Sequence, residues 1–187
     1  MLATQTDTEA AAASSNWISD PFAEAQAGLW FLLRTRSRHE KIVAGDLAAR
    51  GVLHFLPLMN SLKYYGNRKV GVSVPLFPGY VFLRGVAEDA YALDRSGNIA
   101  QIIRVNDQIQ LNEQLKNIAF ALQQNAELCQ FPYLKKGVRV EVVAGPFRGL
   151  RGVIEDLGKR NRLILQVEIL GRGVSLEVDA ALLDVID

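Results

Sequence analysis

The sequence predicts an α+β N-terminal domain, a mixed α/β sandwich, joined by a linker to a small all-β barrel. Three observations support this prediction. Strand-like and helical runs are mixed through residues 29–128 without strict βαβ repetition. From Val138 onward, apolar residues alternate with charged ones, and glycine-rich turns separate about five short runs, as in a small closed barrel. The 187 residues are 49% hydrophobic and 22% charged, which is typical of a folded globular protein.

The chain divides into four segments by composition. Residues 1–28 are rich in Ala, Ser, Thr and acids and show no apolar periodicity, so we expect a flexible acidic arm. Residues 29–128 form the α+β domain. Residues 129–136, which include Pro132, read as a linker, and residues 137–187 form the barrel.

The expected elements of the α+β domain are, in chain order, a strand, a helix, a strand, two hairpin strands, a strand, a helix, a strand and a helix, over residues 30–34, 38–50, 52–58, 61–65, 70–74, 80–84, 87–95, 99–105 and 112–128. The first strand is an apolar and aromatic run that starts at Trp30, and Gly51 ends the first helix. Pro57 has no backbone N–H to donate, so it places the second strand at a sheet edge.

Turn-forming residues indicate where the hairpin turns and where the strand 80–84 begins. Gly66 and Asn67 are the residue types of a two-residue hairpin turn. Pro78 suits position i+1 and Gly79 the positive-φ position of a type II turn before the strand 80–84. In the last helix, apolar residues recur at helical spacing from Leu115 onward.

The barrel strands are expected over residues 138–142, 152–156, 163–169 and 175–178, with a further short strand completing the five. Turns between them are marked by Gly145-Pro146, Gly158-Lys159 and Gly171-Arg172-Gly173. Valine and isoleucine dominate these runs and favour strand over helix. We therefore expect a stable barrel in isolation, and a helical spectrum for residues 133–187 alone contradicts that expectation.

Charge is distributed unevenly along the chain. The formal net charge is +1, yet residues 30–84 hold nine Lys and Arg against two acids, whereas residues 1–29 hold four acids and no base. A concentrated basic stretch attracts polyanions whatever the overall charge. A solvated basic face is the alternative interpretation, and shielding of that face is one role open to the acidic arm.

The residues of catalytic and metal sites are sparse. The chain has one cysteine, Cys129, and two histidines, and it lacks CxxC, HExxH, GxSxG and Walker patterns. We expect His39 to be solvated or to contact phosphate, His54 to be structural and Cys129 to be semi-buried. The sequence thus predicts no enzyme, no cofactor and no metal site. No apolar run approaches the roughly 20 residues of a membrane span, and we expect a cytoplasmic monomer without a secretory signal.

The run GPFRGLRGVI, residues 145–154, contains three glycines around a loop that re-enters a strand. No helix follows, which argues against a phosphate cradle. This spacing resembles the KOW motif, and the stretch 134–186 resembles a KOW domain, which implies an SH3-like barrel.

Three earlier motifs precede that module: WFLL with Arg36, Arg38 and Lys41, then FLP at residues 55–57, then PLFPGYVF at residues 75–82. Their order and spacing resemble the NusG family of transcription elongation factors over about residues 30–187. The RSRHEK stretch and the PLFPGYVF phrase resemble the specialised RfaH and UpxY-type paralogues in particular.

The resemblance implies binding to RNA polymerase through an apolar patch that docks on the clamp helices of the largest subunit. The matching positions are Phe31, Phe77, Pro78, Tyr80 and Phe82. Aromatic side chains carry much of the binding energy at such patches. The alternative is that Tyr80 and Phe82 are ordinary core residues. By strand alternation, Val81 and Leu83 face the opposite side, and we favour the interface for Tyr80 and Phe82.

In RfaH-like proteins a basic face also contacts the non-template DNA strand. Arg36 corresponds to one such position. The residues that surround it or extend the positive surface onto the hairpin are Arg38, His39, Lys41, Arg50, Lys63, Arg68 and Lys69. Tyr64 and Tyr65 are available to stack on bases. The His-Thr-Thr element of RfaH has no counterpart between Arg84 and Asn98, so contact with the second large polymerase subunit does not carry over.

For the KOW module, the resemblance implies a ribosomal small-subunit protein or the termination factor Rho as partner. The matching positions are Phe147, Leu150, Leu170 and Arg172. The sequence therefore predicts an operon-specific antitermination factor, associated by resemblance with polysaccharide gene clusters. Two alternatives stay open: a general NusG-type elongation factor, and a KOW-containing ribosomal or RNA-binding protein.

Overall fold

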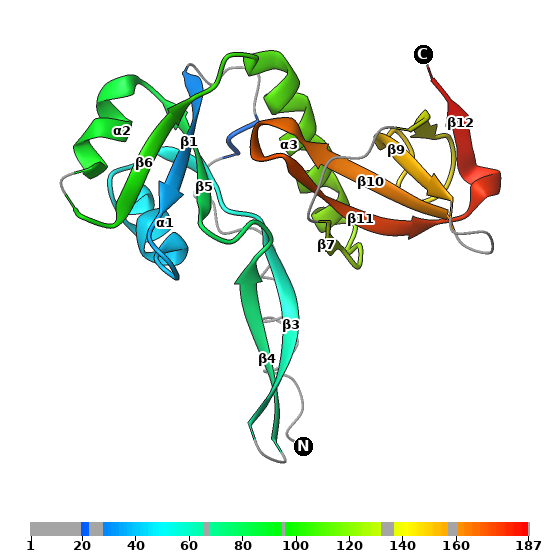
Figure 1. The fold of residues 1–187 in the computed structure, drawn as a ribbon, viewed down its shortest axis with the longest axis horizontal. Coiled ribbons are helices and arrows are strands. Elements are labelled where there is room, and N and C mark those ends of the chain that lie inside the picture. Colours follow the sequence, from blue (N-terminus) through cyan, green and yellow to red (C-terminus); the bar gives the residue numbers. More distant parts are fainter. Residues whose placement is uncertain are drawn as a thin grey trace, which may run out of the picture. The chain divides into compact units, whose positions relative to one another are not determined.

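The computed structural model describes residues 20–22, 28–65, 68–94, 96–131, 137–156 and 161–186 (Figure 1). The chain divides after Val105 into two units, Met1–Val105 and Asn106–Asp187. The expected boundary lay after residue 128, so the helix expected to close the first domain belongs to the second unit. The mixture of helices and antiparallel sheets confirms the α+β expectation.

The first unit is built on a four-stranded antiparallel sheet with the order β2-β5-β1-β6. The strands are β1 (Leu29–Thr35), β2 (Leu53–Phe55), β5 (Tyr80–Gly85) and β6 (Ile99–Arg104). Strand β2 lies at a sheet edge, as Pro57 predicts, but it ends at Phe55 rather than at residue 58. Strand β1 pairs with β5 on one side and β6 on the other, so it is an interior strand.

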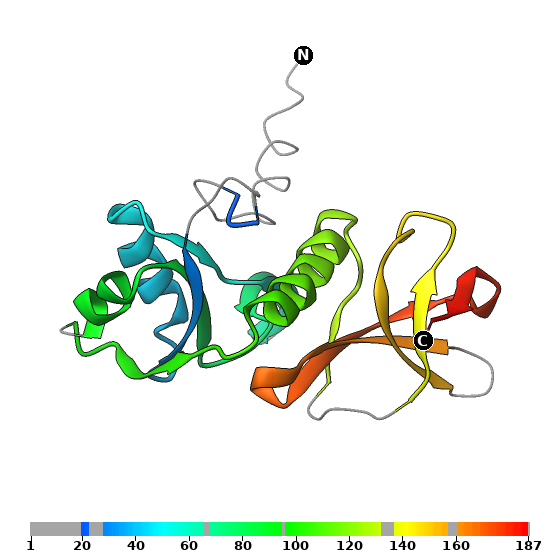
Figure 2. The ribbon, with the colours of Figure 1, turned by 90° about the horizontal axis from the view of Figure 1, so that it is seen from above.

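The two faces of this sheet carry different side chains. Residues directly opposite in an antiparallel pair point to the same side, and the register pairs Leu33 with Val81 and Leu32 with Phe82. The helices α1 (Glu40–Ala49) and α2 (Ala87–Asp94) cover the first side, where Val43, Leu47 and Leu93 join one buried cluster with Leu33, Val81 and Leu83 (Figure 2). The second side carries Trp30, Leu32, Phe55 and Phe82, and we call it the aromatic face.

Helix α1 starts later than expected. Arg38 has φ of +64°, a left-handed conformation that no residue inside an α-helix adopts, so the helix begins at Glu40 rather than at residue 38. At the other end Gly51 has φ of +70°, which confirms it as the helix stop.

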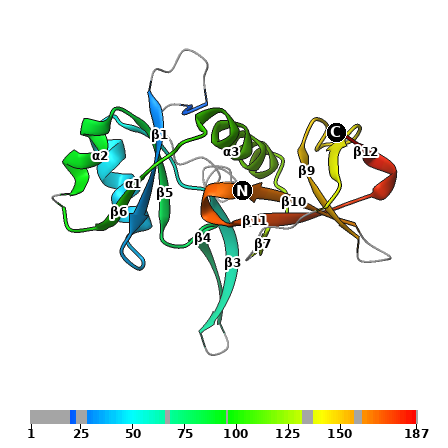
Figure 3. The ribbon, with the colours of Figure 1, turned by 45° about the horizontal axis from the view of Figure 1, so that its top comes forward.

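A long hairpin of β3 (Leu58–Tyr65) and β4 (Arg68–Pro75) projects away from the sheet of the first unit (Figure 3). The two strands pair from Leu58 with Pro75 to Tyr65 with Arg68, which confirms and extends the expected hairpin. The turn residues Gly66 and Asn67 lie outside the described residues.

The second unit begins with α3 (Gln108–Gln123), which is earlier than the expected helix because Asp107 caps it: its Oδ1 accepts the N–H of Gln110 at 2.8 Å. A six-stranded antiparallel sheet follows, with the order β12-β8-β9-β10-β11-β7. Its strands are β7 (Cys129–Phe131), β8 (Arg139–Val142), β9 (Arg151–Asp156), β10 (Asn161–Val167), β11 (Arg172–Val178) and β12 (Leu183–Val185).

The start of the expected linker is wrong, because Cys129–Phe131 forms a strand that pairs with β11. Residues 132–136 of that segment lie outside the described residues. The expected strands of the C-terminal module are present as β8 to β11, and β12 supplies the fifth. Closure of this sheet into an SH3-like barrel stays a prediction.

Gly152 lies where β9 crosses β10 closely. A Cβ at this position would lie 2.5 Å from the carbonyl oxygen of Ile164 and 2.9 Å from a Leu163 methyl. We expect Gly152→Ala to lower the free energy of unfolding of the second unit by about 1–3 kcal/mol, because the backbones must separate.

Urea unfolding followed by circular dichroism measures this loss. Gly45→Ala is the control, since nothing lies within 4 Å of that position on α1 and alanine is the better helix former. Equal effects of the two substitutions would contradict the close approach at Gly152.

Candidate functional site

The PLFPGYVF phrase contains a tight turn that the rest of the first unit holds in place. The N–H of Tyr80 donates to the Phe77 carbonyl at 3.2 Å, and Gly79 has φ of +86°, which confirms the type II turn. The Gly79 carbonyl accepts the N–H of Thr35 at 2.8 Å. Its N–H donates to Oε1 of Glu40 at 2.6 Å. The backbone N–H and the carbonyl of Gly79 are therefore both held by hydrogen bonds with neighbouring elements.

Glu40 is the side chain that connects α1 to this turn. It is 6% exposed, although it is an acid in the first turn of a helix. Next to it, Nζ of Lys41 donates to the Ser73 carbonyl at 2.7 Å, so the same helical turn also holds β4. Glu40 was not predicted as a site residue, because a lone acid at a helix start is common on solvated surfaces.

The five candidate polymerase-binding residues do not form one exposed patch. Phe31 packs in the cluster under α1 and α2, and Phe77 is 2% exposed. Phe82 is fully buried, so the expectation that it presents an exposed surface is wrong for this conformation. Pro78 is exposed and Tyr80 is half-buried. The predicted alternation is confirmed, because Val81 and Leu83 lie in the cluster on the opposite side.

Phe82 is buried in a group of aromatic rings. Its centroid lies 6.4 Å from that of Phe55 and 6.2 Å from that of Phe77, the latter ring edge-on. Phe22 extends the group, with its centroid 5.2 Å from Phe55 and 5.6 Å from Trp30. Part of the segment expected to be a flexible arm, residues 20–22, therefore packs on the aromatic face. On the same side of the sheet, Arg34 is exposed and lies opposite Tyr80.

The basic residues before α1 are presented by a structured turn. His39 N–H donates to the Arg36 carbonyl at 3.1 Å, and Arg36 N–H donates to the Asn98 carbonyl at 2.9 Å. Arg36 and Arg38 are exposed, and Nδ1 of the half-buried His39 lies 2.8 Å from the Ser37 carbonyl oxygen. Strained non-glycine residues such as Arg38 often occur at functional sites.

The other candidate nucleic-acid residues are spread over the first unit. Lys41 is exposed but holds β4, and Arg50 lies at the far end of α1, about 15 Å from its start by helical rise. Lys69 is exposed on β4, opposite Tyr64. The side chains of Lys63 and Arg68 lie outside those that the structure describes. One basic surface that includes all eight positions is therefore not shown.

His54 is a buried side chain of β2, with 3% of its surface exposed and Nδ1 3.0 Å from the Val52 carbonyl oxygen. Burial lowers the pKa of this imidazole below its usual value, and the contact with Val52 opposes that shift only in part. His54 is thus a structural residue, as the sequence suggests. Cys129, expected to be semi-buried, is exposed on β7.

The described residues contain no group of three or more His, Cys, Asp and Glu side chains that lie close enough to hold a metal ion. Among the helices of the described ranges, none is both long and apolar enough to cross a membrane.

In the second unit, the four candidate partner-binding positions differ in exposure. Leu150 is fully buried, so it is a core residue here. Its backbone N–H donates to the Phe147 carbonyl at 3.0 Å. Phe147, Leu170 and Arg172 are half-buried. Phe147 belongs to the turn between β8 and β9 that the glycine-rich motif forms.

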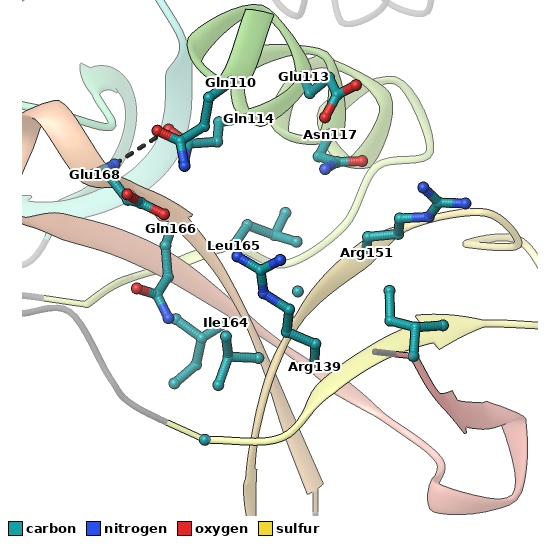
Figure 4. Close-up of a pocket in the computed structure, with 14 residues that line it drawn as sticks. Gln110, Glu113, Gln114, Asn117, Arg139, Arg151, Ile164, Leu165, Gln166 and Glu168 are labelled. Atoms are coloured by element: carbon teal, nitrogen blue, oxygen red, sulfur yellow. Dashed lines mark hydrogen bonds between the residues drawn. The ribbon is translucent and has the colours of Figure 1, made fainter. Parts of the chain in front are cut away.

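The second unit also contains an open cavity of about 530 Å³ between α3 and the sheet (Figure 4). Polar side chains of α3, among them Gln110 and Asn117, face the guanidinium groups of Arg139 and Arg151 across it. Arg151 is engaged by Glu141 at 2.7 Å, and Gln114 accepts the N–H of Glu168 at 3.1 Å. Acidic and basic side chains both line the cavity, so the charge of the lining favours neither anionic nor cationic ligands.

The hydrogen bond between Glu40 and Gly79 should contribute to the stability of the first unit. We expect Glu40→Ala to lower the free energy of unfolding of the first unit by about 1.5–3 kcal/mol, the range for hydrogen bonds to charged groups, because Gly79 N–H loses its acceptor. Urea unfolding measures this, with Glu88→Ala, an exposed acid in the first turn of α2, as the matched control. Losses of equal size would mean that the contact with Gly79 adds little.

His54 makes a pH prediction. Its folded-state pKa is lowered, so the unfolded chain binds the proton more tightly, and stability falls as pH drops below the unfolded value of about 6.5. Between pH 7.5 and 5.5 we expect wild type to lose up to about 1.4 kcal/mol per pH unit, and His54→Gln to lose less. A flat wild-type profile, or an equal slope in His54→Gln, would contradict this account.

Two comparisons with known proteins bear on this chain. The family model described as "Transcription termination factor nusG" matches residues 28–119, from the start of β1 into α3. The transcription termination/antitermination protein NusG of Deinococcus radiodurans is 27% identical over 135 residues, covering 61% of this chain and 70% of that protein. Residues 28–119 are therefore similar to the NusG family.

Proposed function

We propose that this protein is a transcription elongation and antitermination factor that binds RNA polymerase during elongation through the aromatic face and the turn 77–80. The NusG family is a family of transcription factors, not of enzymes, and it acts with the transcription machinery. The observation that carries the proposal is the turn 77–80, which lies inside the matched segment and is fixed by Glu40 and Thr35. A partner then meets a preorganised surface, which lowers the cost of binding.

The polymerase surface in this proposal has an exposed edge and a buried centre. The exposed Pro78 and the half-buried Tyr80 form the edge, and the exposed Arg34 lies opposite Tyr80 on the neighbouring strand. Phe82 and Phe77 lie behind them and support the edge. The resemblance to the NusG family implies docking on the clamp helices of the largest subunit, and rigid aromatic side chains suit such an interface.

The nucleic-acid surface is proposed to start at the turn before α1. Arg36 and Arg38 are exposed there, and the first turn of α1 adds the positive end of the helix dipole. The non-template DNA strand is the proposed ligand. Lys69 on the hairpin extends the positive charge toward the hairpin tip.

For the second unit we propose a KOW-type barrel that recruits another machine, either a ribosomal small-subunit protein or Rho. The strand order supports this, because the last strand, β12, pairs with β8 and so returns to the beginning of the module. Half-buried Phe147 and Arg172 are the proposed contacts. We further propose that the protein is a cytoplasmic monomer. We also propose an operon-specific role, because the PLFPGYVF phrase resembles that of the specialised paralogues, which have such a role.

A general NusG-type elongation factor is the second candidate, and the similarity to the NusG of Deinococcus radiodurans favours it. A Rho-dependent termination assay separates the two. The specialised factor should reduce termination on its own operon, whereas a general factor should support Rho.

The docking surface predicts the effect of one substitution. Tyr80→Ala should weaken binding to core RNA polymerase about tenfold or more, the effect expected when an interface anchor is truncated. Binding is measured by titration of labelled protein, with unfolding midpoints to show that the variant folds. Tyr91→Ala, which truncates an exposed aromatic residue of α2, should bind as wild type does. No binding by wild type, or equal binding by both variants, would overturn the proposal.

A further inference from the structure

The segment Asp20–Phe22 lies outside the NusG-family match and yet makes specific contacts with the matched domain. The Phe22 ring packs edge-on against Phe55 and is tilted against Trp30, at centroid distances of 5.2 and 5.6 Å. Pro21 is buried beside it. Aromatic pairs at such distances are attractive beyond the area that they bury.

Polar contacts fix the same segment. Nη1 of Arg84 donates to the Pro21 carbonyl at 2.5 Å, while the guanidinium lies 5.7 Å from the centroid of Trp30. Within the segment, the N–H of Phe22 donates to Oδ1 of Asp20 at 2.9 Å and shapes a local turn. Ring packing, a charge-assisted hydrogen bond and a local turn therefore all fix the position of Phe22. A nonspecific apolar contact would not need the two polar interactions.

We propose that Asp20–Phe22 is an intramolecular competitor that occupies part of the surface on which RNA polymerase docks. This inference rests on the proposed function. Polymerase must displace Phe22 to reach the aromatic face, so the free protein holds its own docking surface partly closed.

The geometry supports competition because the two binding regions are continuous. Phe22 contacts Phe55, Phe55 packs against Phe82, and Phe82 packs against Phe77 of the fixed turn. Tyr80 lies two residues from Phe82 on the same strand and therefore on the same side. A partner centred on Pro78 and Tyr80 that extends over Phe55 would meet Phe22.

The tether makes the segment an effective competitor. Only seven residues, 23–29, separate Phe22 from Trp30 in the chain. A segment joined to its binding site by so few residues has a high effective concentration there, so a weak contact is enough to occupy the site. A polymerase contact of higher affinity still displaces it, because both compete for one surface.

Titration of core RNA polymerase with full-length Phe22→Ala tests the proposal. We expect this variant to bind about three- to tenfold more tightly than wild type, the factor that corresponds to one aromatic contact. Tyr91→Ala, the matched aromatic truncation on α2, should bind as wild type does. A Phe22→Ala affinity equal to or below that of wild type would overturn the proposal and make the segment only a structural clasp.

A second readout does not need polymerase. With Trp17→Phe as background, Trp30 is the single tryptophan, and it is 2% exposed. Phe22→Ala should increase acrylamide quenching of its fluorescence, whereas Tyr91→Ala should leave quenching unchanged. Unchanged quenching in Phe22→Ala would show that the segment does not cover the aromatic face. If quenching rises but polymerase binds neither protein, the cover is present and the proposed function fails.

Discussion

The antiparallel register of β1 with β5 is the constraint on which the first unit depends. Pairing Leu33 with Val81 and Leu32 with Phe82 gives one side of the sheet to the helices and the other to the aromatic rings. A slip of one residue would exchange these two sets. The register therefore determines the core and, at the same time, the side chains that a partner can meet on the aromatic face.

The beginning of α1 connects the two proposed surfaces. Glu40 holds Gly79 of the turn 77–80, Lys41 holds Ser73 of the hairpin, and Arg38 lies just before them. A nucleic acid bound near Arg38 and a polymerase bound at Tyr80 would thus share one helical turn as support. This arrangement suits a factor that must hold two partners at a fixed separation without any chemical step.

Local signals predicted local structure well. Pro57 marked the edge strand, Gly51 ended the helix and the Pro78-Gly79 pair produced its type II turn, because each depends on backbone chemistry of one or two residues. Arg38 and Asp107 shifted two helix starts, since a positive φ and a cap are set by the surrounding turn rather than by apolar spacing. Strand β7 was missed for a similar reason: three residues show no periodicity, and pairing with β11 defines them.

The site residues were harder to predict, because alternation tells which side a residue faces but not whether that side is covered. Phe82 and Leu150 were taken for contacts and are fully buried. Phe22 and Glu40 were not singled out, since a single ring in an acidic, low-complexity stretch and a single acid at a helix start carry no pattern. Phe22 contacts Trp30 and Phe55, and Glu40 contacts Gly79. These partners lie 8 to 39 residues away in sequence, so the contacts form only in the folded chain.

Hydroxyl-radical footprinting of side chains, with and without core RNA polymerase, tests most directly whether the aromatic face is the docking surface. We expect polymerase to lower the reactivity of Tyr80 and Pro78, to raise that of Phe22 and to leave that of Tyr91 unchanged. Unchanged reactivity at Tyr80 and Phe22, together with protection elsewhere on the chain, would contradict it.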